Sequence, residues 1–329
     1  MRSIERKTDS SVLTPFQRSL DSERIYRKGN LDNGLSRDRR DPHTLRILSW
    51  NIAHGRSLSK ISETIKRIKP DIACLQEVDW GNERTNGRDN LQLIAEETNM
   101  LGLFGIEFFE VCSPRRSAKL AGGGVVGNAI LTQHEPLTAF RVELPESLKW
   151  HKGAEDLSLP PKVRHRVERE TRIGKRFGLG AEFQISDRQM LVTSLHLEDK
   201  YGGVNGRWAQ YRAAVDAVEN RTQAPKVSVI AGDFNTFDCR LARFVAPDND
   251  ATALGKPTDI KESAWWKTNL LSSTAYKDPF DARDWTFSVG PLFRAKLDWI
   301  TVDGLQFKDA GIGPFSSSDH RPVWADLKL

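Results

Sequence analysis

The pattern of hydrophobic and polar positions changes near residue 44 of this 329-residue chain. Residues 1–43 are polar and show little apolar periodicity, so we expect them to form a flexible leader. From Leu45 onward, short apolar runs alternate with amphipathic patterns. The chain is therefore predicted to consist of this leader and one large domain, residues 44–329, that can bury a substantial core.

Short apolar runs that end in turn residues predict buried strands. They lie at residues 46–55, 71–79, 108–113, 127–132, 177–197 (two strands around a polar turn), 226–236, 295–303 and 321–327. Apolar residues at helical spacing predict helices at residues 61–68, ending before Pro70, and at residues 91–100 and 208–218. This mixture predicts an α+β fold, a four-layer α/β/β/α sandwich of two packed mixed β-sheets flanked by helices.

The net charge of +5 is unevenly distributed. The leader carries +3 and residues 149–176 carry +5, which leaves the rest of the chain at −3. A general nucleic-acid-binding surface is therefore not indicated. The basic insertion at about residues 146–176 runs into the strand that begins at Phe177, and a hairpin would place Phe177 beside His196. This segment is either a rim that binds additional phosphates or a solvated surface insertion.

The cysteine pattern and the hydropathy give an expectation for the cellular compartment of the protein. Cys74, Cys112 and Cys239 are odd in number, widely spaced and without a CxxC pair, which favours a reducing environment. The first twenty residues contain no apolar signal region, and no run approaches the roughly 18 apolar residues of a membrane span. We expect a soluble, cytoplasmic monomer.

Polar residues recur within or just after the apolar strands, and this is the strongest indication of chemistry. Buried carboxylates are costly unless they are paired or bound to a metal ion, so their recurrence at strand ends predicts a common site at one rim of a sheet. Taken singly, each could be a turn cap or a structural pair. The candidates are Asn51, Glu77, His196, Asp233, Asn235, Asp298, Asp319 and His320.

The order of the motifs identifies a family. SWNIAHG, LQEVD, GNAILT, LVTSLHLE, AGDFNT, KLDWITV and SSDHRPVWADL follow one another between Arg46 and Leu329. In this order the chain resembles the endonuclease/exonuclease/phosphatase superfamily of deoxyribonuclease-like, metal-dependent phosphoesterases. The resemblance implies a hydrolase of phosphate esters that uses Mg²⁺, with Mn²⁺ as a substitute.

The resemblance also implies a role for each candidate. Mg²⁺ prefers oxygen ligands, and Glu77 corresponds to the principal one, with Asn51 and Asp319 completing or positioning the shell. The aspartate that matches Asp298 orients the histidine that matches His320.

The other candidates would act on the phosphate. Asp233 and Asn235 would face the scissile phosphorus, and either Asp233 or His320 could be the general base. His196 matches the second histidine of deoxyribonuclease-like members. In deoxyribonuclease a glutamate on the strand that matches GNAILT supports this histidine, and here Asn128 is the candidate replacement.

The mechanism so implied is in-line attack of water on phosphorus. A phosphodiesterase is expected, a phosphomonoesterase for a small phosphorylated substrate is the alternative, and a non-catalytic binding module of the same fold is a third hypothesis. The substrate could be nucleic acid, a nucleotide or an inositol phosphate.

Overall fold

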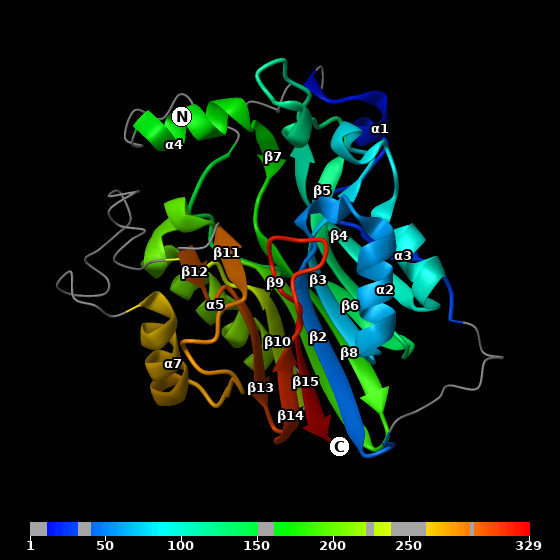
Figure 1. Ribbon diagram of the computed structural model, residues 1–329, viewed down its shortest axis with the longest axis vertical. Helices are drawn as coiled ribbons and strands as arrows, with labels where there is room; N and C mark the ends of the chain where they lie inside the picture. The colour runs from blue at the N-terminus through cyan, green and yellow to red at the C-terminus, as the bar shows by residue number, and fades with distance from the viewer. Residues whose placement is uncertain (1–11, 32–40, 151–160, 222–226, 238–260, 290–292) are drawn as a thin grey trace, which may run out of the picture.

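The computed structural model describes residues 12–31, 41–150, 161–221, 227–237, 261–289 and 293–329. Parts of the expected leader (residues 1–11 and 32–40), part of the basic segment (residues 151–160) and Cys239 lie outside this range. Within it, two large sheets form the centre of the molecule (Figure 1).

The first sheet contains the parallel pair of β2 and β3 among antiparallel neighbours. Its order is β1 (Ile25–Lys28), β4 (Leu101–Glu110), β5 (Val125–Thr132), β3 (Ile72–Trp80), β2 (Thr44–Asn51), β15 (Val323–Lys328) and β14 (Phe307–Ile312), with β7 (Arg172–Gly174) paired to β4.

The second sheet contains the parallel pair of β9 and β10. Its order is β13 (Asp298–Asp303), β10 (Val227–Asp233), β9 (Arg188–His196), β8 (Phe177–Ile185) and β6 (Pro136–Glu143). A small separate hairpin consists of β11 (Phe287–Val289) and β12 (Phe293–Ala295).

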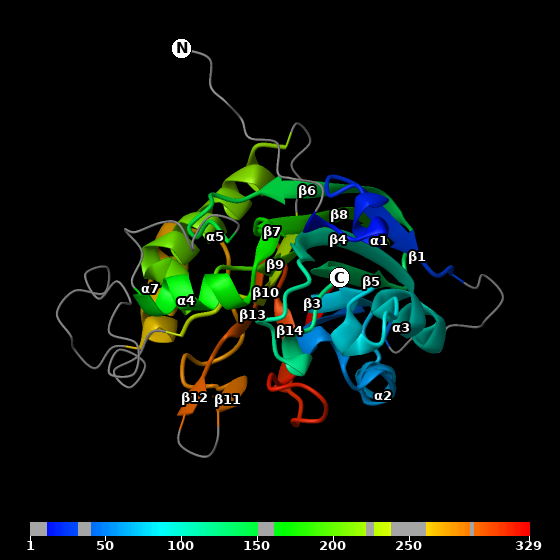
Figure 2. The same ribbon diagram turned by 90° about the horizontal axis from the view of Figure 1, so that it is seen from above.

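Helices cover the outer faces of both sheets (Figure 2). α2 (Leu58–Ile68) and α3 (Asn90–Thr98) pack on the first sheet, and α5 (Gly203–Glu219) and α7 (Glu262–Ser273) pack on the second. The remaining helical elements are α1 (Pro15–Arg18), α4 (Pro161–Arg169), η2 (Ala53–Gly55), η3 (Glu83–Thr85), η4 (Ala118–Leu120) and η5 (Lys200–Gly202).

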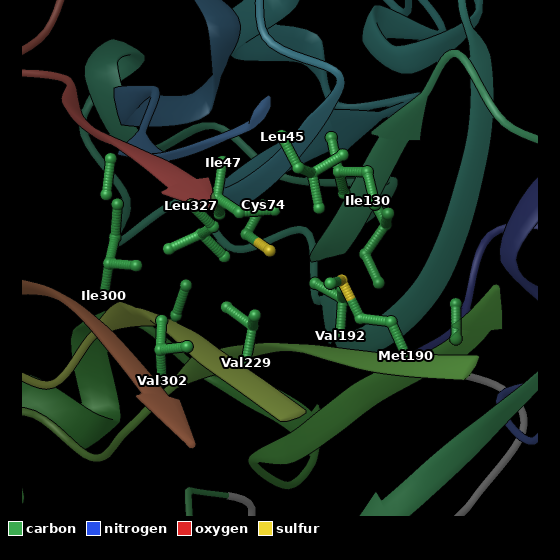
Figure 3. Packing of buried hydrophobic residues seen from close by; sticks show 14 of the residues in the cluster. Leu45, Ile47, Cys74, Ile130, Met190, Val192, Val229, Ile300, Val302 and Leu327 are labelled. Carbon is green, nitrogen blue, oxygen red and sulfur yellow. The ribbon is translucent and has the colours of Figure 1, made fainter. Parts of the chain in front are cut away.

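The inner faces of the two sheets pack against each other through apolar side chains (Figure 3). Ile47 and Cys74 of the first sheet belong to the same buried cluster as Val192 and Val229 of the second. Both faces of β2 are covered, because Ile47 contributes to this inner core while Trp50 packs in the cluster beneath α2 and α3. This double burial explains why the strands are apolar runs without alternation. The predicted four-layer α/β/β/α sandwich is confirmed.

The predicted hairpin is also present. β8 and β9 are antiparallel, with Gly178 opposite Leu195, so Phe177 lies at the same end of the sheet as His196. The basic segment that precedes Phe177 is thereby brought to the end of the sheet where β9 terminates.

The expectation of a flexible leader does not hold for residues 14–28. Thr14 caps α1, and Gln17 donates hydrogen bonds to the carbonyl oxygens of Glu110 and Gly124. β1 then pairs with β4 as an edge strand of the first sheet. Its half-buried pattern carries little apolar signal, which is why sequence periodicity overlooks it.

Among the described residues, no helix combines the length and the apolar character needed to cross a membrane.

Candidate active site

Seven of the eight candidate residues line one cavity of about 250 Å³, and Asp298 lies behind it, fully buried. The seven are Asn51, Glu77, His196, Asp233, Asn235, Asp319 and His320. A second cavity, of about 370 Å³, lies at the other end of β2, where Leu45, Arg46 and Asp326 contribute to its lining. The conjunction of carboxylates, amides and imidazoles makes the first cavity the candidate active site.

Strand pairing brings these side chains together. β10 runs between β9 and β13, with Asp233 opposite both His196 and Asp298. Asn51 ends β2 in the other sheet, and its Nδ2 donates to Asp233 Oδ2 at 3.0 Å. The cavity therefore lies where the two sheets meet at one rim of the sandwich.

Glu77 reaches the cavity through a distortion of β3. The pairing of β3 with β5 shifts register between Leu75 and Val78, and Glu77 within this bulge has a φ of 52°. A left-handed backbone is unfavourable for a glutamate, and such strain persists only where the surrounding structure enforces it. The bulge turns the Glu77 side chain toward the cavity, where it remains half-buried.

His54 joins Glu77 to a second carboxylate of the same strand. Its Nε2 lies 3.3 Å from Glu77 Oε2, and its Nδ1 lies 3.2 Å from Asp79 Oδ1. Asp79 is fully buried and is held by two guanidinium contacts from Arg84 at 2.7 Å. From the sequence, His54 belongs to the SWNIAHG motif and, taken alone, is more often a structural histidine, so its contact with Glu77 was not predicted.

The electrostatic environment keeps Glu77 ionised. Burial opposes its ionisation, but the electrostatic interactions with His54, His196 and His320 outweigh burial and lower the pKa of Glu77. Arg172 contributes in the same direction. Glu77 therefore presents a charged carboxylate to the cavity, as a hard cation requires.

His320 is held between two aspartates. Its Nδ1 lies 2.8 Å from Asp298 Oδ2, and its Nε2 lies 3.7 Å from Asp233 Oδ2. Burial lowers the pKa of His320, but the carboxylates of Asp298 and Asp233 outweigh burial and raise the pKa to about 10. The ring is therefore an imidazolium near neutral pH, and Asp298 fixes its orientation.

His196 has a carboxylate partner that was not predicted. Its Nδ1 lies 3.5 Å from Glu107 Oε2 and 2.7 Å from Arg176 Nη1. Asn128, the expected substitute, instead donates to the carbonyl oxygen of Phe177 at 2.9 Å. The replacement proposed for Asn128 is therefore wrong, because the acid lies on β4. The available signal was one carboxylate within the otherwise apolar residues 101–109.

Asp233 and Asn235 are fixed by the loop after β10. Asp233 Oδ1 accepts the backbone N–H of Asn235, and Asn235 Nδ2 donates to the carbonyl oxygen of Leu197. Asn235 has a φ of 50°, and with Glu77 and His54 (φ 67°) it is one of three residues of the cavity lining that have a left-handed backbone. Asp233 Oδ2 lies 3.7 Å from Nε2 of both His196 and His320, so it stands between the two imidazoles.

In the part of the chain that the structure describes, two groups of residues at this cavity have the chemistry to hold a metal ion. Among the described residues, ligand atoms of Asp233, Asp298 and His320 lie within 4.8 Å of one another. His320 and Asp298 are already within hydrogen-bond distance, and this contact explains why the ligand atoms of the group lie close together. Asn51, Glu77 and Asp319 offer only oxygen ligands in the same cavity, which fits Mg²⁺ better than a set containing imidazole.

Sequence comparison decides the family. The chain matches the profile of the Endonuclease/Exonuclease/phosphatase family over residues 48–320. The chain belongs to this family. It is therefore related to hydrolases of phosphoester bonds. No curated protein matches the sequence significantly.

Solved structures of similar fold agree with this assignment. An endonuclease/exonuclease/phosphatase from Beutenbergia cavernae DSM 12333 has 18% identity and a TM-score of 0.60, covering 87% of this chain and 72% of that one. The human Nocturnin catalytic domain with bound sulfate has 19% identity and a TM-score of 0.53, covering 86% and 93%. ANGEL2, a 2′,3′-cyclic phosphatase, has 14% identity and a TM-score of 0.53, covering 86% and 95%. At these identities the likeness concerns the fold.

Proposed function

We propose that the chain is a Mg²⁺-dependent phosphodiesterase that catalyses in-line attack of water on phosphorus. One observation supports this most directly. The ionised Glu77 and the His320–Asp298 pair converge on one cavity, with Asp233 between two imidazoles. An oxygen ligand for a metal, an oriented cation and a carboxylate that can accept a proton are the groups that phosphoester hydrolysis requires.

Glu77, Asn51 and Asp319 would hold the ion. Bound Mg²⁺, or Mn²⁺ in its place, supplies positive charge that neutralises phosphate oxygens and polarises the phosphorus. Asn51 Oδ1 accepts the backbone N–H of Ala53, and a carbonyl oxygen retains a second lone pair for a ligand. The exposed carboxylate of Asp319 completes the oxygen set.

Asp233 is the better candidate for the general base. With its pKa raised to about 10, His320 is already protonated near neutral pH and is suited to anchor a phosphate oxygen. Asp233 Oδ2 lies 3.7 Å from that ring and accepts only the Asn51 amide among the described residues, so it is available to a water molecule. Asp298 acts as a positioning residue for His320.

His196 and Asn235 would act on the oxygens of the phosphate. The Arg176 guanidinium, which can only donate, lies 2.7 Å from His196 Nδ1, so Nδ1 accepts and the ring donates from Nε2 toward the cavity, where a leaving oxygen would need a proton. Asn235 uses one N–H for the Leu197 carbonyl and keeps the other for a non-bridging oxygen. His196 would give the leaving oxygen its proton in a diester and in a monoester alike, so the preference for a diester is tested by comparing the two substrates.

The test is hydrolysis of three substrates side by side: bis(p-nitrophenyl) phosphate, p-nitrophenyl phosphate and plasmid DNA, each with Mg²⁺ and with EDTA. We expect metal-dependent cleavage that is faster for the diester than for the monoester. Preference for the monoester would replace the phosphodiesterase with a phosphomonoesterase. Failure on all three substrates together with failure to bind Mg²⁺ would support a non-catalytic module.

A further inference from the structure

The basic segment contributes to the wall of the catalytic cavity, but most of its charge is already neutralised. Arg166, Arg172 and Arg176 line the cavity, and each lies near two carboxylates. The pairs are Arg166 with Asp199 (3.0 Å) and Glu170 (3.4 Å), Arg172 with Glu110 (3.0 Å) and Glu170 (3.2 Å), and Arg176 with Glu107 (3.1 Å) and Glu198 (3.6 Å). These arginines therefore hold the wall together, and little of their charge remains for a ligand.

Lys200 differs from these arginines. It follows Asp199 in the loop after β9, is half-buried and lines the same cavity. Within the described part of the chain, no carboxylate forms an ion pair with its ammonium group, and its Nζ lies 5.2 Å from the centroid of the Tyr201 ring. Burial, and then the nearby Arg166, lower the pKa of Lys200 more than the neighbouring Asp199 carboxylate raises it. The ammonium group thus lies where an additional negative charge would be stabilised.

We propose that Lys200 binds a second phosphate of the substrate, next to the scissile one. The inference rests on the proposed function, because it assumes that the scissile phosphate occupies the part of the cavity lined by Glu77 and His320. A lysine binds phosphate as a point charge, and an anion inside the cavity would supply the counter-charge that Asp199, already paired with Arg166, supplies only in part. The substrate class is accordingly a compound with two neighbouring phosphates, such as a nucleoside bisphosphate ester or a dinucleotide.

The same charge pattern limits the size of the ligand on this side. Long polyanions are held by many unpaired cations, and their binding weakens steeply with salt. Among the described residues of the basic segment that line the cavity, every arginine is paired, and Lys200 adds one unpaired charge. We therefore expect recognition of one extra phosphate on this wall, with a salt dependence corresponding to about one contact.

The test compares substrates that differ by one phosphate. Thymidine 5′-(p-nitrophenyl phosphate) is assayed with and without a 3′-phosphate, and thymidine 3′-(p-nitrophenyl phosphate) with and without a 5′-phosphate, so that both directions of binding are covered. The wild-type protein should prefer the bisphosphate in at least one pair, by about tenfold in kcat/KM. Lys200→Ala should remove most of this preference, mainly through KM, and Lys200→Arg should retain much of it. Lys60→Ala, an exposed cation on α2, is the matched control and should retain it fully.

Binding separates this inference from the proposed function. The Kd values of thymidine 3′,5′-bisphosphate and of each thymidine monophosphate are measured by calorimetry on the wild-type and Lys200→Ala proteins, with Mg²⁺ present. A bisphosphate preference that falls about tenfold in Lys200→Ala supports the subsite even if no ester is cleaved, in which case only the proposed activity fails. An equal preference for the bisphosphate over the monophosphates in the two proteins, by both binding and kinetics, would overturn the subsite and leave Lys200 without a role in binding.

Discussion

Replacing His54 by alanine should weaken Mg²⁺ binding without unfolding the protein. The His54 ring lies 3.3 Å from Glu77 and 3.2 Å from Asp79. Its removal therefore leaves the Glu77 carboxylate, the proposed metal ligand, without this contact. Glu77 lies on a strained bulge and depends on such contacts for its orientation. Asp79 stays in place through Arg84, which limits the effect on the fold.

The magnitude follows from the nature of the contact. Loss of a partner that orients a metal ligand weakens metal binding by about 10- to 100-fold, which is about 1.4 to 2.8 kcal/mol. We expect the Kd of Mg²⁺ for His54→Ala to rise within this range. His54→Gln, whose amide can donate to Glu77 in place of Nε2, should lose less.

Isothermal titration calorimetry with Mg²⁺, supported by paramagnetic resonance with Mn²⁺, measures this effect independently of catalysis. Thermal unfolding establishes that the variants are folded, and His43→Ala, which removes an exposed imidazole from residues near the other end of β2, is the matched control. A folded His54→Ala protein that binds Mg²⁺ within twofold of the wild-type Kd would refute the assignment of His54 as a positioning residue.

Three further predictions concern the carboxylates of β4 and the cysteines. Glu107→Gln should lower kcat by roughly 10²-fold, because His196 loses its carboxylate partner, while calorimetry shows an unchanged Kd for Mg²⁺. A loss of Mg²⁺ affinity as large as the loss of kcat would contradict this role. Burial raises the pKa of Glu110, but surrounding guanidinium groups outweigh burial and lower it to about 2. Its charge therefore stabilises the fold fully above pH ~4.5, by about 3 kcal/mol, and this contribution is lost as the pH falls toward 2. Urea unfolding of Glu110→Gln should accordingly show a lower free energy of unfolding at pH 7 and a smaller loss of this free energy as the pH falls. A loss at low pH as large as that of the wild-type protein would count against the ion pairs. Burial raises the pKa of Cys74 to about 12, so peptide mapping after thiol labelling of the folded protein should find exposed Cys112 modified and Cys74 protected. Rapid labelling of Cys74 would contradict its burial.

The sequence predicted the convergence of the candidate residues because strand ends are local signals. Asp233 and His196 each end an apolar run, and the parallel pairing of their strands makes them neighbours. The four layers were likewise predictable from run length and helical spacing, since both faces of the central strands are buried.

The supporting contacts depend on tertiary packing and were not predictable in this way. Glu107 meets His196 only because β4 and β9 lie in different sheets that pack together, and no spacing rule connects them. The left-handed backbone of Glu77 depends on a register shift against β5, which its local sequence does not encode. Edge strand β1 has too few buried residues to show a period.

The charge of the basic segment could be interpreted only with the structure. The sequence left open whether this segment is a rim or a solvated insertion. Arg166, Arg172 and Arg176 do line the cavity, as the rim interpretation required, but carboxylates distant in sequence neutralise them. A net charge counted along the chain therefore overestimated the charge available to a substrate.

The most direct test of the account is the Mg²⁺ dependence of bis(p-nitrophenyl) phosphate hydrolysis by the wild-type and Glu77→Gln proteins, with folding checked by circular dichroism. The account predicts a wild-type rate that saturates with Mg²⁺ and vanishes with EDTA, and a folded Glu77→Gln protein slower by at least about 10²-fold. A folded Glu77→Gln protein with a near-wild-type, Mg²⁺-dependent rate would contradict the placement of the metal-dependent site at Glu77.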